Sequence, residues 1–386
     1  MTEHPWTAGQ AAPADQELIL STLEKLVDLP GPSGFEDAVA ETVIAALESS
    51  GARIETDTLG NVIARDPLQG RPSDTPILMI SAHMDEVGLI VSHVAESGAL
   101  FCRPIGLINE RALPGSTVDV WGSRGRRTGV IGVKSRHLMT DEEARRPILV
   151  EDLWIDVGAR SAAQAMEAGI DVGVPITFAR TWDQLEGDQV VSKALDNRAG
   201  CAALLAVASR VASLSRDFEL VLAFTVQEEI GSRGARVAAE NVRPALALVV
   251  DTTPAGEWDG AGGRRVGTIL GMGPVIRAMD ERPGYGGTVY TPAVRRRLED
   301  VAREAGIPSQ VDVFPTWTDA SGIHLAAEGV AIGGVYIPRR NSHSPVEILA
   351  LADVLATIEL IARFLIDVMA TDIADLRRRP AFPLGR

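Results

Sequence analysis

The chain has 386 residues, 46% of them hydrophobic, which favours two packed domains, and its formal net charge of −15 argues against nucleic acid or an anionic membrane as the main partner. No apolar run is long enough to cross a bilayer, and the first residues lack the basic and apolar regions of a signal peptide. With only two cysteines, Cys102 and Cys201, no disulfide framework is expected, and we predict a cytoplasmic protein.

The N-terminal part predicts helices and strands that follow a polar tail at residues 1–14. Apolar residues at helical spacing predict helices over residues 15–29 and 35–50, and Ser33 with Glu36 resembles a capping box for the second helix. Three β-favouring runs come next, over residues 53–56, 62–65 and 76–82. The last run is apolar except for Ser81, as expected of a strand that is covered on both faces.

Residues 89–182 change character and predict a small β-barrel or sandwich inserted into an α/β domain. Their short β-like runs, separated by Gly and Pro, cover residues 89–93, 118–120, 128–133, 153–156 and 176–178. The α/β domain is therefore split between residues 15–88 and 183–372, and residues 373–386 form a C-terminal tail.

Helices and strands alternate again in the second part of the α/β domain. Helices are predicted over residues 197–211, from 232 onward, and over 292–305 and 349–369. Strands are predicted over residues 218–226, 245–250, 310–314 and 330–337, with a Gly-rich loop at 256–265.

Two adjacent glutamates, Glu228 and Glu229, follow the predicted strand 218–226. Strand ends of open α/β sheets are where ligand chemistry is usually placed. Neighbouring side chains of an extended strand point to opposite faces, so the backbone must leave the strand there if both glutamates serve one site. On this stretch alone, a solvated acidic turn that begins the next helix is an equal alternative.

Further metal-type side chains also lie at the ends of predicted core elements. His83 and Asp85 share a face of extended chain, so Asp85 could hold the ring of a metal-binding His83, or His83 could simply be a hydrogen-bonded core histidine. Asp196 precedes a helix, where a helix N-cap is the obvious alternative. Asp251 ends a buried strand, and His343 follows the predicted strand 330–337.

Together these segments resemble peptidase family M42, which comprises two-metal aminopeptidases and includes the glutamyl and tetrahedral aminopeptidases. The resemblance covers nearly all of the chain after residue 17. It is carried by DTLGN at 57–61, HMDEVG at 83–88, GVIG at 129–132 with His137, DVGA at 156–159, LDNR at 195–198, QEEIG at 227–231 with RGA at 233–235, and HSP at 343–345. It implies a mixed-sheet, zinc-peptidase-like catalytic domain with an inserted PDZ-like dimerisation domain.

The resemblance also implies a metal-dependent aminopeptidase that removes N-terminal residues from peptides with a hydroxide held by two metal ions. One metal would be held by His83, Asp196 and Asp251, and a second by Asp196, Glu229 and His343. Glu228 would be the general base and Asp85 would support His83. His and carboxylate ligands suit Zn²⁺, or else Co²⁺. A homo-oligomer built from dimers, up to a dodecamer, is implied as well.

The chain departs from the family pattern near the substrate pocket. Asn197 stands where a second Asp is usual, and the Asp196–Asn197 bond is where a cis peptide is expected. Residues 317–320 (WTDA) replace a more Gly-rich stretch, and Asn341 replaces an aromatic residue.

Two other functions fit some of these residues. A related two-metal amidohydrolase, such as an N-acyl-amino-acid deacylase or a carboxypeptidase-like enzyme, would keep the metal centre. An endoglucanase would instead use Glu228 and Glu229 as its carboxylate pair, although such pairs flank the sugar and require no metal. His93, His324 and Cys201 are expected to be structural, and we assign no role to His137.

Overall fold

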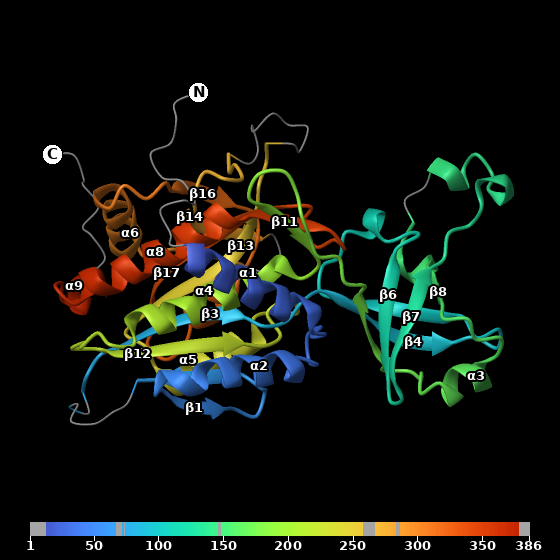
Figure 1. Ribbon diagram of the computed structural model, residues 1–386, viewed down its shortest axis with the longest axis horizontal. Coiled ribbons are helices and arrows are strands. Elements are labelled where there is room, and N and C mark those ends of the chain that lie inside the picture. Colours follow the sequence, from blue (N-terminus) through green and yellow to red (C-terminus); the bar gives the residue numbers. More distant parts are fainter. Residues whose placement is uncertain are drawn as a thin grey trace.

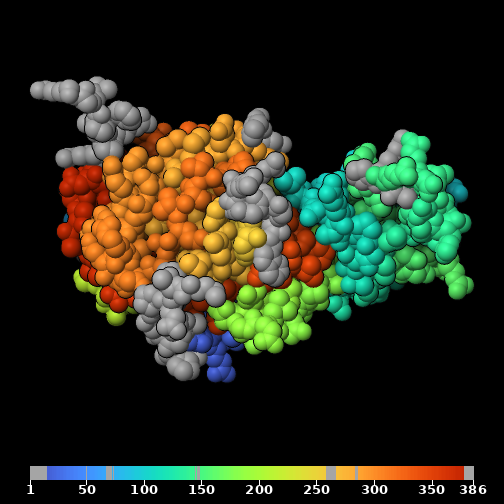
Figure 2. Space-filling model, turned by 90° about the horizontal axis from the view of Figure 1, so that it is seen from above, coloured from blue at the N-terminus to red at the C-terminus, as the bar shows by residue number. Residues whose placement is uncertain are grey.

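The computed structural model describes residues 13–66, 72, 74–145, 148–257, 267–282 and 286–377. Most of the predicted N-terminal tail and Gly-rich loop, and residues 378–386, lie outside these ranges. The molecule consists of a larger α/β body and a smaller β body at one end of its long axis (Figure 1). The view from above shows the same division, with residues near 100–180 projecting from the α/β body (Figure 2).

A 12-stranded mixed sheet forms the centre of the larger body. Its main path runs through β1 (Arg53–Thr56), β2 (Val62–Arg65), β12 (Glu219–Thr225), β3 (Ile77–His83), β13 (Leu246–Pro254), β17 (Ala331–Arg340), β18 (Glu347–Ala350), β11 (Gln189–Ser192) and β10 (Asp183–Gln184). Off this path, β14 (Val275–Arg282) pairs with β17, and both β15 (Gly286–Val289) and β16 (Gln310–Phe314) pair with β14. The neighbours β12, β3, β13 and β17 are parallel, so their carboxyl ends share one edge of the sheet.

Alternating side chains of the parallel strands enter two separate cores. In β3, Leu78 and Ile80 belong to one core and Met79 to the other, which follows from the two-residue period of a strand. The first core lies under α1 (Pro13–Asp28), α2 (Asp37–Leu47), α4 (Leu195–Val211), α6 (Pro292–Glu304), α8 (Leu351–Val368) and α9 (Ile373–Arg377). The second core lies under α5 (Arg233–Val242) and α7 (Asp319–Ile323).

The smaller body is a closed antiparallel barrel with its own apolar core. Its strands, in barrel order, are β4 (Gly88–Val94), β5 (Leu100–Ile105), β8 (Trp154–Asp156), β7 (Gly125–Ile131), β6 (Thr117–Gly122) and β9 (Pro175–Phe178). Helix α3 (Ala162–Glu167) and the short 3₁₀ turns η3 (Glu110–Ala112), η4 (Arg136–Leu138), η5 (Glu143–Arg145) and η6 (Val150–Asp152) connect them, while η2 (Glu48–Ser50) follows α2. The predicted fold class, a mixed α/β body with a separate small β-barrel, is confirmed.

The predicted capping box at Ser33 and Glu36 is wrong. Helix α2 begins at Asp37 without a side-chain cap. Ser33 Oγ donates instead to Asp85 Oδ2 at 2.6 Å, and Glu36 Oε1 accepts the amides of Gly34 at 2.9 Å and Gln227 at 3.0 Å. Ser33 therefore makes a long-range contact with the segment that follows β3, and Glu36 makes one with the turn that follows β12.

The predicted C-terminal tail also begins too early. Residues Ile373–Arg377 form α9, whose Ile373 and Leu376 are buried in the first core, so packing continues past residue 372. Strand β14 had no prediction because its Arg277 and Asp280 make it look polar, yet both are fully buried and paired with each other. Among the helices of the described ranges, none is both long and apolar enough to span a lipid bilayer.

Candidate metal and catalytic site

The seven side chains singled out in the sequence meet at the shared carboxyl edge of the parallel strands. They are His83, Asp85, Asp196, Glu228, Glu229, Asp251 and His343. His83 ends β3, Asp251 lies in the last part of β13, and the glutamates follow β12. Asp196 lies in the first turn of α4, and His343 follows β17. This is the place where the topology of an open α/β sheet positions ligands.

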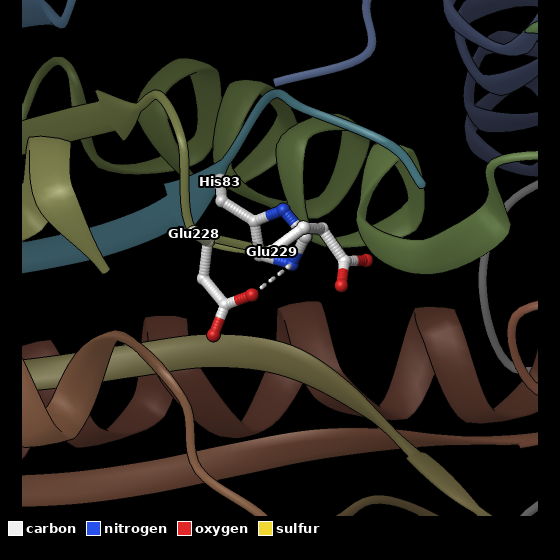
Figure 3. Close-up of side chains that lie close together, drawn as sticks. All are labelled: His83, Glu228 and Glu229. Atoms are coloured by element: carbon white, nitrogen blue, oxygen red, sulfur yellow. Dashed lines mark ion pairs between the residues drawn. The ribbon is translucent and has the colours of Figure 1, made fainter. Parts of the chain in front are cut away.

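The chain leaves strand β12 before the two glutamates. Gln227 has a left-handed backbone, with φ of 57°, and the amides of Gly231 and Ser232 close a turn on the Glu228 carbonyl at 2.8 and 2.9 Å. This turn removes the alternation of an extended strand. Both glutamates consequently reach the imidazole of His83, with Glu228 Oε2 4.0 Å from Nε2 (Figure 3).

Asp85 holds this turn against the histidine. Its Oδ1 accepts the amide of Glu228 at 2.9 Å, and its Oδ2 accepts the amide of Glu229 at 3.1 Å. The same carboxylate lies 3.4 Å from His83 Nδ1. Burial opposes ionisation of Asp85, but its hydrogen bonds with His83 and Ser33 hold its pKa below the ordinary value. One carboxylate thus fixes the ring of His83 and the backbone of both glutamates.

The ligand-type atoms form three groups; one joins His83 to Glu228 and Glu229, and the other two share Asp196. In the first of these two groups, His83 Nε2 lies 3.3 Å from Asp196 Oδ1 and 3.4 Å from Asp251 Oδ1. In the second group, His343 Nε2 lies 3.1 Å from Asp196 Oδ2 and 3.6 Å from Glu229 Oε1. Within each group the three atoms all lie within 4.8 Å of one another. The shared carboxylate gives one oxygen to each group, as a bridging ligand would.

Buried oxygens in these groups call for a cation. Asp196 Oδ1 and Glu229 Oε1 are inaccessible to solvent and accept no hydrogen bond from any described residue. An unsatisfied buried carboxylate oxygen is costly unless a cation or donor compensates it. The groups open into a cavity of roughly 210 Å³, which leaves room for ions and substrate. The residues therefore fit one or two divalent cations.

The pKa directions reflect the same excess of negative charge. Burial, with the negative charges of neighbouring carboxylates, raises the pKa of Glu228 well above its ordinary value and that of Glu229 to about 8. Burial lowers the pKa of His83, but Asp251 and Asp196 outweigh it and raise that pKa well above the ordinary value. Binding of divalent cations would replace the protons that these groups hold.

Sequence reasoning missed the residues that support the two groups. Glu347, 2% exposed, accepts the amide of Asp196 at 3.0 Å and that of His343 at 2.9 Å. The buried guanidinium of Arg339 contacts the carboxylates of both Asp196 and Glu347 and donates to Thr252 Oγ1 at 2.6 Å. Glu347 lies four residues after His343, but local spacing gave no signal that it would reach back to α4.

The departures from the family pattern fall into three places. The Asp196–Asn197 peptide bond is cis, as predicted, and Asn197 is buried, donating to the Val250 carbonyl at 2.8 Å. Asn341 is exposed and donates to the Val346 carbonyl at 3.1 Å, so it does not line the cavity. Trp317 does line the cavity, and its indole donates to Glu228 Oε1 at 3.1 Å.

The remaining histidines of the described ranges and the cysteines lie outside the two groups. His93 packs against Phe101 with ring centroids 6.2 Å apart, and His324 Nδ1 lies 3.1 Å from the Val330 carbonyl. His137 is exposed in η4. Both cysteines are buried and unpaired, and Cys201 Sγ contacts the His83 carbonyl at 3.1 Å.

Comparison with known proteins identifies the family. Residues 60–360 match the sequence model of the M42 glutamyl aminopeptidases. The chain belongs to this family. It is accordingly an aminopeptidase, a hydrolase that acts on peptide bonds.

Relatives resemble this aminopeptidase over nearly their whole length. The lysyl aminopeptidase of Pyrococcus furiosus is 33% identical over 354 residues, which cover 91% of this chain and 97% of that protein. The structure is similar to that of the aminopeptidase APDkam598 from the archaeon Desulfurococcus kamchatkensis, with a TM-score of 0.88, 34% identity, and coverage of 95% and 99% of the two chains. It also resembles the Pyrococcus horikoshii TET1 peptidase, which can assemble into a tetrahedron or a large octahedral shell (TM-score 0.79, 30% identity, coverage of 90% and 99%).

Proposed function

We propose that this aminopeptidase releases single residues from the N-terminus of peptides, using two divalent cations and Glu228 as the general base. The observation that carries the proposal is the pair of overlapping ligand groups that share Asp196, with Glu228 Oε2 only 4.0 Å from His83. Two cations bridged by one carboxylate are the arrangement that co-catalytic hydrolases use.

The ligand assignment follows from the two groups. His83, Asp196 and Asp251 would hold one cation, and Asp196, Glu229 and His343 the other. Three ligand carboxylates and two imidazoles leave a positive balance on two divalent ions, which favours an anionic nucleophile and transition state. Nitrogen and carboxylate ligands support Zn²⁺, with Co²⁺ as the next choice, over Mg²⁺ or Ca²⁺.

When bound, the cations supply Lewis-acid chemistry that makes water a better nucleophile and polarises the scissile carbonyl. Glu228 is placed to take the proton of the attacking water on Oε2 and to return a proton to the leaving amine. Burial raises the pKa of Glu228, and cations held beside it would favour its ionised form, which is the form that accepts a proton. Asp85 keeps both the His83 ring and the backbone of Glu228 in place during this transfer.

The relatives support action at a free amino terminus. The matching family model is that of aminopeptidases, and the similar lysyl aminopeptidase of Pyrococcus furiosus is matched over 97% of its length. The proposal therefore favours an aminopeptidase that acts at a free terminus over an N-acyl-amino-acid deacylase.

We further propose a homo-oligomer assembled through the barrel. The exposed apolar side chains Val130, Val133, Leu138 and Leu149 lie in or after β7, and the TET1 peptidase forms closed shells. Light scattering after size-exclusion chromatography would report a mass several times that of one chain. A monodisperse monomer would contradict this part. Two unpaired cysteines are consistent with a reducing cytoplasm.

A peptide-library digest tests the function. The protein is loaded with Zn²⁺ or Co²⁺, incubated with a free and an N-acetylated version of one library, and the products are read by mass spectrometry. We expect stepwise loss from the N-terminus of the free peptides, intact acetylated peptides, and no products in chelator. Cleavage of the acetylated library or loss from the C-terminus would support the related amidohydrolases instead. Glycan cleavage that persists in chelator would support an endoglucanase.

A further inference from the structure

The indole of Trp317 donates a hydrogen bond to the carboxylate of Glu228. The indole Nε1 donates to Oε1 at 3.1 Å, while Oε2 faces His83 at 4.0 Å. The two oxygens of Glu228 therefore have different surroundings. Because a glutamate side chain has considerable rotamer freedom, one anchored oxygen determines where the other points.

The backbone that carries Trp317 is itself held on several sides. Thr318 is the N-cap of α7, where its Oγ1 accepts the amide of Ala320 at 3.3 Å and contacts the hydroxyl of Tyr336 at 3.0 Å. Its carbonyl accepts Ser232 Oγ at 3.1 Å, and Ser232 belongs to the turn that follows Glu229. The loop with the indole and the turn with the glutamates are thus attached to each other by a buried contact.

Trp317 also lines two cavities. It lines the catalytic cavity together with Phe314 and Arg282, and the Arg282 guanidinium lies 5.9 Å from its centroid. It also lines a cavity of about 220 Å³ near Arg236 and Leu325. A β-carbon on Gly231 would lie 3.2 Å from the ring, so the indole is packed tightly against the catalytic turn.

We propose that Trp317 is a positioning residue for Glu228 and a wall of the substrate cavity. Its N–H holds Oε1 and so presents Oε2 to the reacting water, and its ring contacts the substrate. This inference rests on the proposed function, because Glu228 must act as the base. It ties substrate contact to the orientation of the base through one side chain.

Two substitutions separate the parts of this role. Trp317→Phe keeps a ring and removes the N–H, and we expect kcat to fall roughly ten- to a hundredfold with KM within about twofold, because misplacing a catalytic group costs rate rather than binding. Trp317→Ala also removes the wall and should raise KM. The control Trp121→Phe deletes another indole hydrogen bond, to Thr177 Oγ1 at 2.9 Å in the barrel, and should leave kcat unchanged.

A double-mutant cycle shows whether Trp317 acts through Glu228. In a Glu228→Gln background, Trp317→Phe should lower the residual kcat by less than twofold, whereas a general loss of folding would lower it by the full factor. Bound metal and unfolding temperature are measured for every variant. A Trp317→Phe enzyme with kcat within twofold of wild type, while Glu228→Gln is inactive, would overturn this inference and leave the proposed function standing. Wild-type protein that releases no N-terminal residue would refute the proposed function itself.

If Trp317→Phe does not fold, Trp317→His takes its place because it retains a ring N–H. Trp317→His should keep kcat within tenfold of wild type. A larger loss with normal metal content would also overturn the inference.

Discussion

Replacing Glu347 by glutamine is expected to weaken binding of both proposed cations, and of the second more than the first. The carboxylate of Glu347 accepts the amides of Asp196 at 3.0 Å and His343 at 2.9 Å, and it is paired with Arg339. Asp196 is common to both ligand groups, whereas His343 belongs to the second alone. The substitution preserves shape and removes charge.

The magnitude follows from the bonds that are lost. A glutamine keeps one acceptor oxygen, so one of the two backbone amides loses its partner and the other hydrogen bond is no longer charge-assisted. A hydrogen bond to a charged group contributes about 1.5–3 kcal/mol. Residues that orient metal ligands usually change metal affinity by about 10–100-fold, or roughly 1.4–2.8 kcal/mol. We expect about tenfold at the first site, where only Asp196 is affected, and about a hundredfold at the second.

The assay is a titration with buffered free Zn²⁺, read as bound metal per subunit by mass spectrometry and compared with calorimetry. Glu328→Gln is the matched control, because Glu328 is exposed and outside the cavity. Unfolding of the metal-free variants separates lost stability from lost affinity. Two binding steps with wild-type affinities in Glu347→Gln would refute the reasoning.

Three further predictions concern the supports of the site, the cations and the pH dependence of folding. Ser33→Ala deletes the 2.6 Å donor to Asp85, which keeps its two backbone donors. We therefore expect the free energy of unfolding to fall by about 1–2 kcal/mol and kcat to fall several-fold. An enzyme unchanged in denaturant titration and kinetics would contradict the long-range role of Ser33. Chelation should abolish activity and lower the unfolding temperature, because a ligand present at a hundred times its Kd adds about 2.7 kcal/mol to stability. Added Zn²⁺ should restore both the activity and the unfolding temperature. Full activity in chelator would count against a metal enzyme. Burial raises the pKa of the Asp353 carboxyl from 3.8 to about 7, despite its bonds from the amides of Gly271 and Gly273, so its stabilising contribution is complete below about pH 4 and is lost as the pH rises through 7. Wild type should therefore lose up to about 4 kcal/mol more than Asp353→Asn between pH 4 and pH 8, and identical pH profiles in chemical denaturation would disprove this.

The sequence predicted the central sheet because its strands are marked by simple patterns. The run over residues 76–82 is apolar except for Ser81 and leads into His83, so both the strand and the position of its last side chain could be inferred. The same reasoning placed Asp251 and the two glutamates at one edge. Strand β14 escaped because Arg277 and Asp280 neutralise each other inside the core, a pairing that no periodicity reveals.

The supports of the site could not be predicted from local spacing. Ser33 and Glu36 have the spacing of a capping box, but their partners lie 52 and 191 residues away along the chain. Trp317 and Glu228 are separated by 89 residues, and Glu347 and Asp196 by 151. Such contacts depend on how the strands are ordered in the sheet, and that order is a property of the folded chain.

The kinetics and metal content of Glu228→Gln test the central claim most directly. Glutamine keeps the shape of the side chain and its contact with Trp317 but cannot take the proton of water. We expect two cations per subunit, an unchanged KM, and a kcat lower by roughly 10²–10⁴-fold, the range that general acid–base catalysis contributes. A variant that binds both cations and hydrolyses peptides at the wild-type rate would contradict the account.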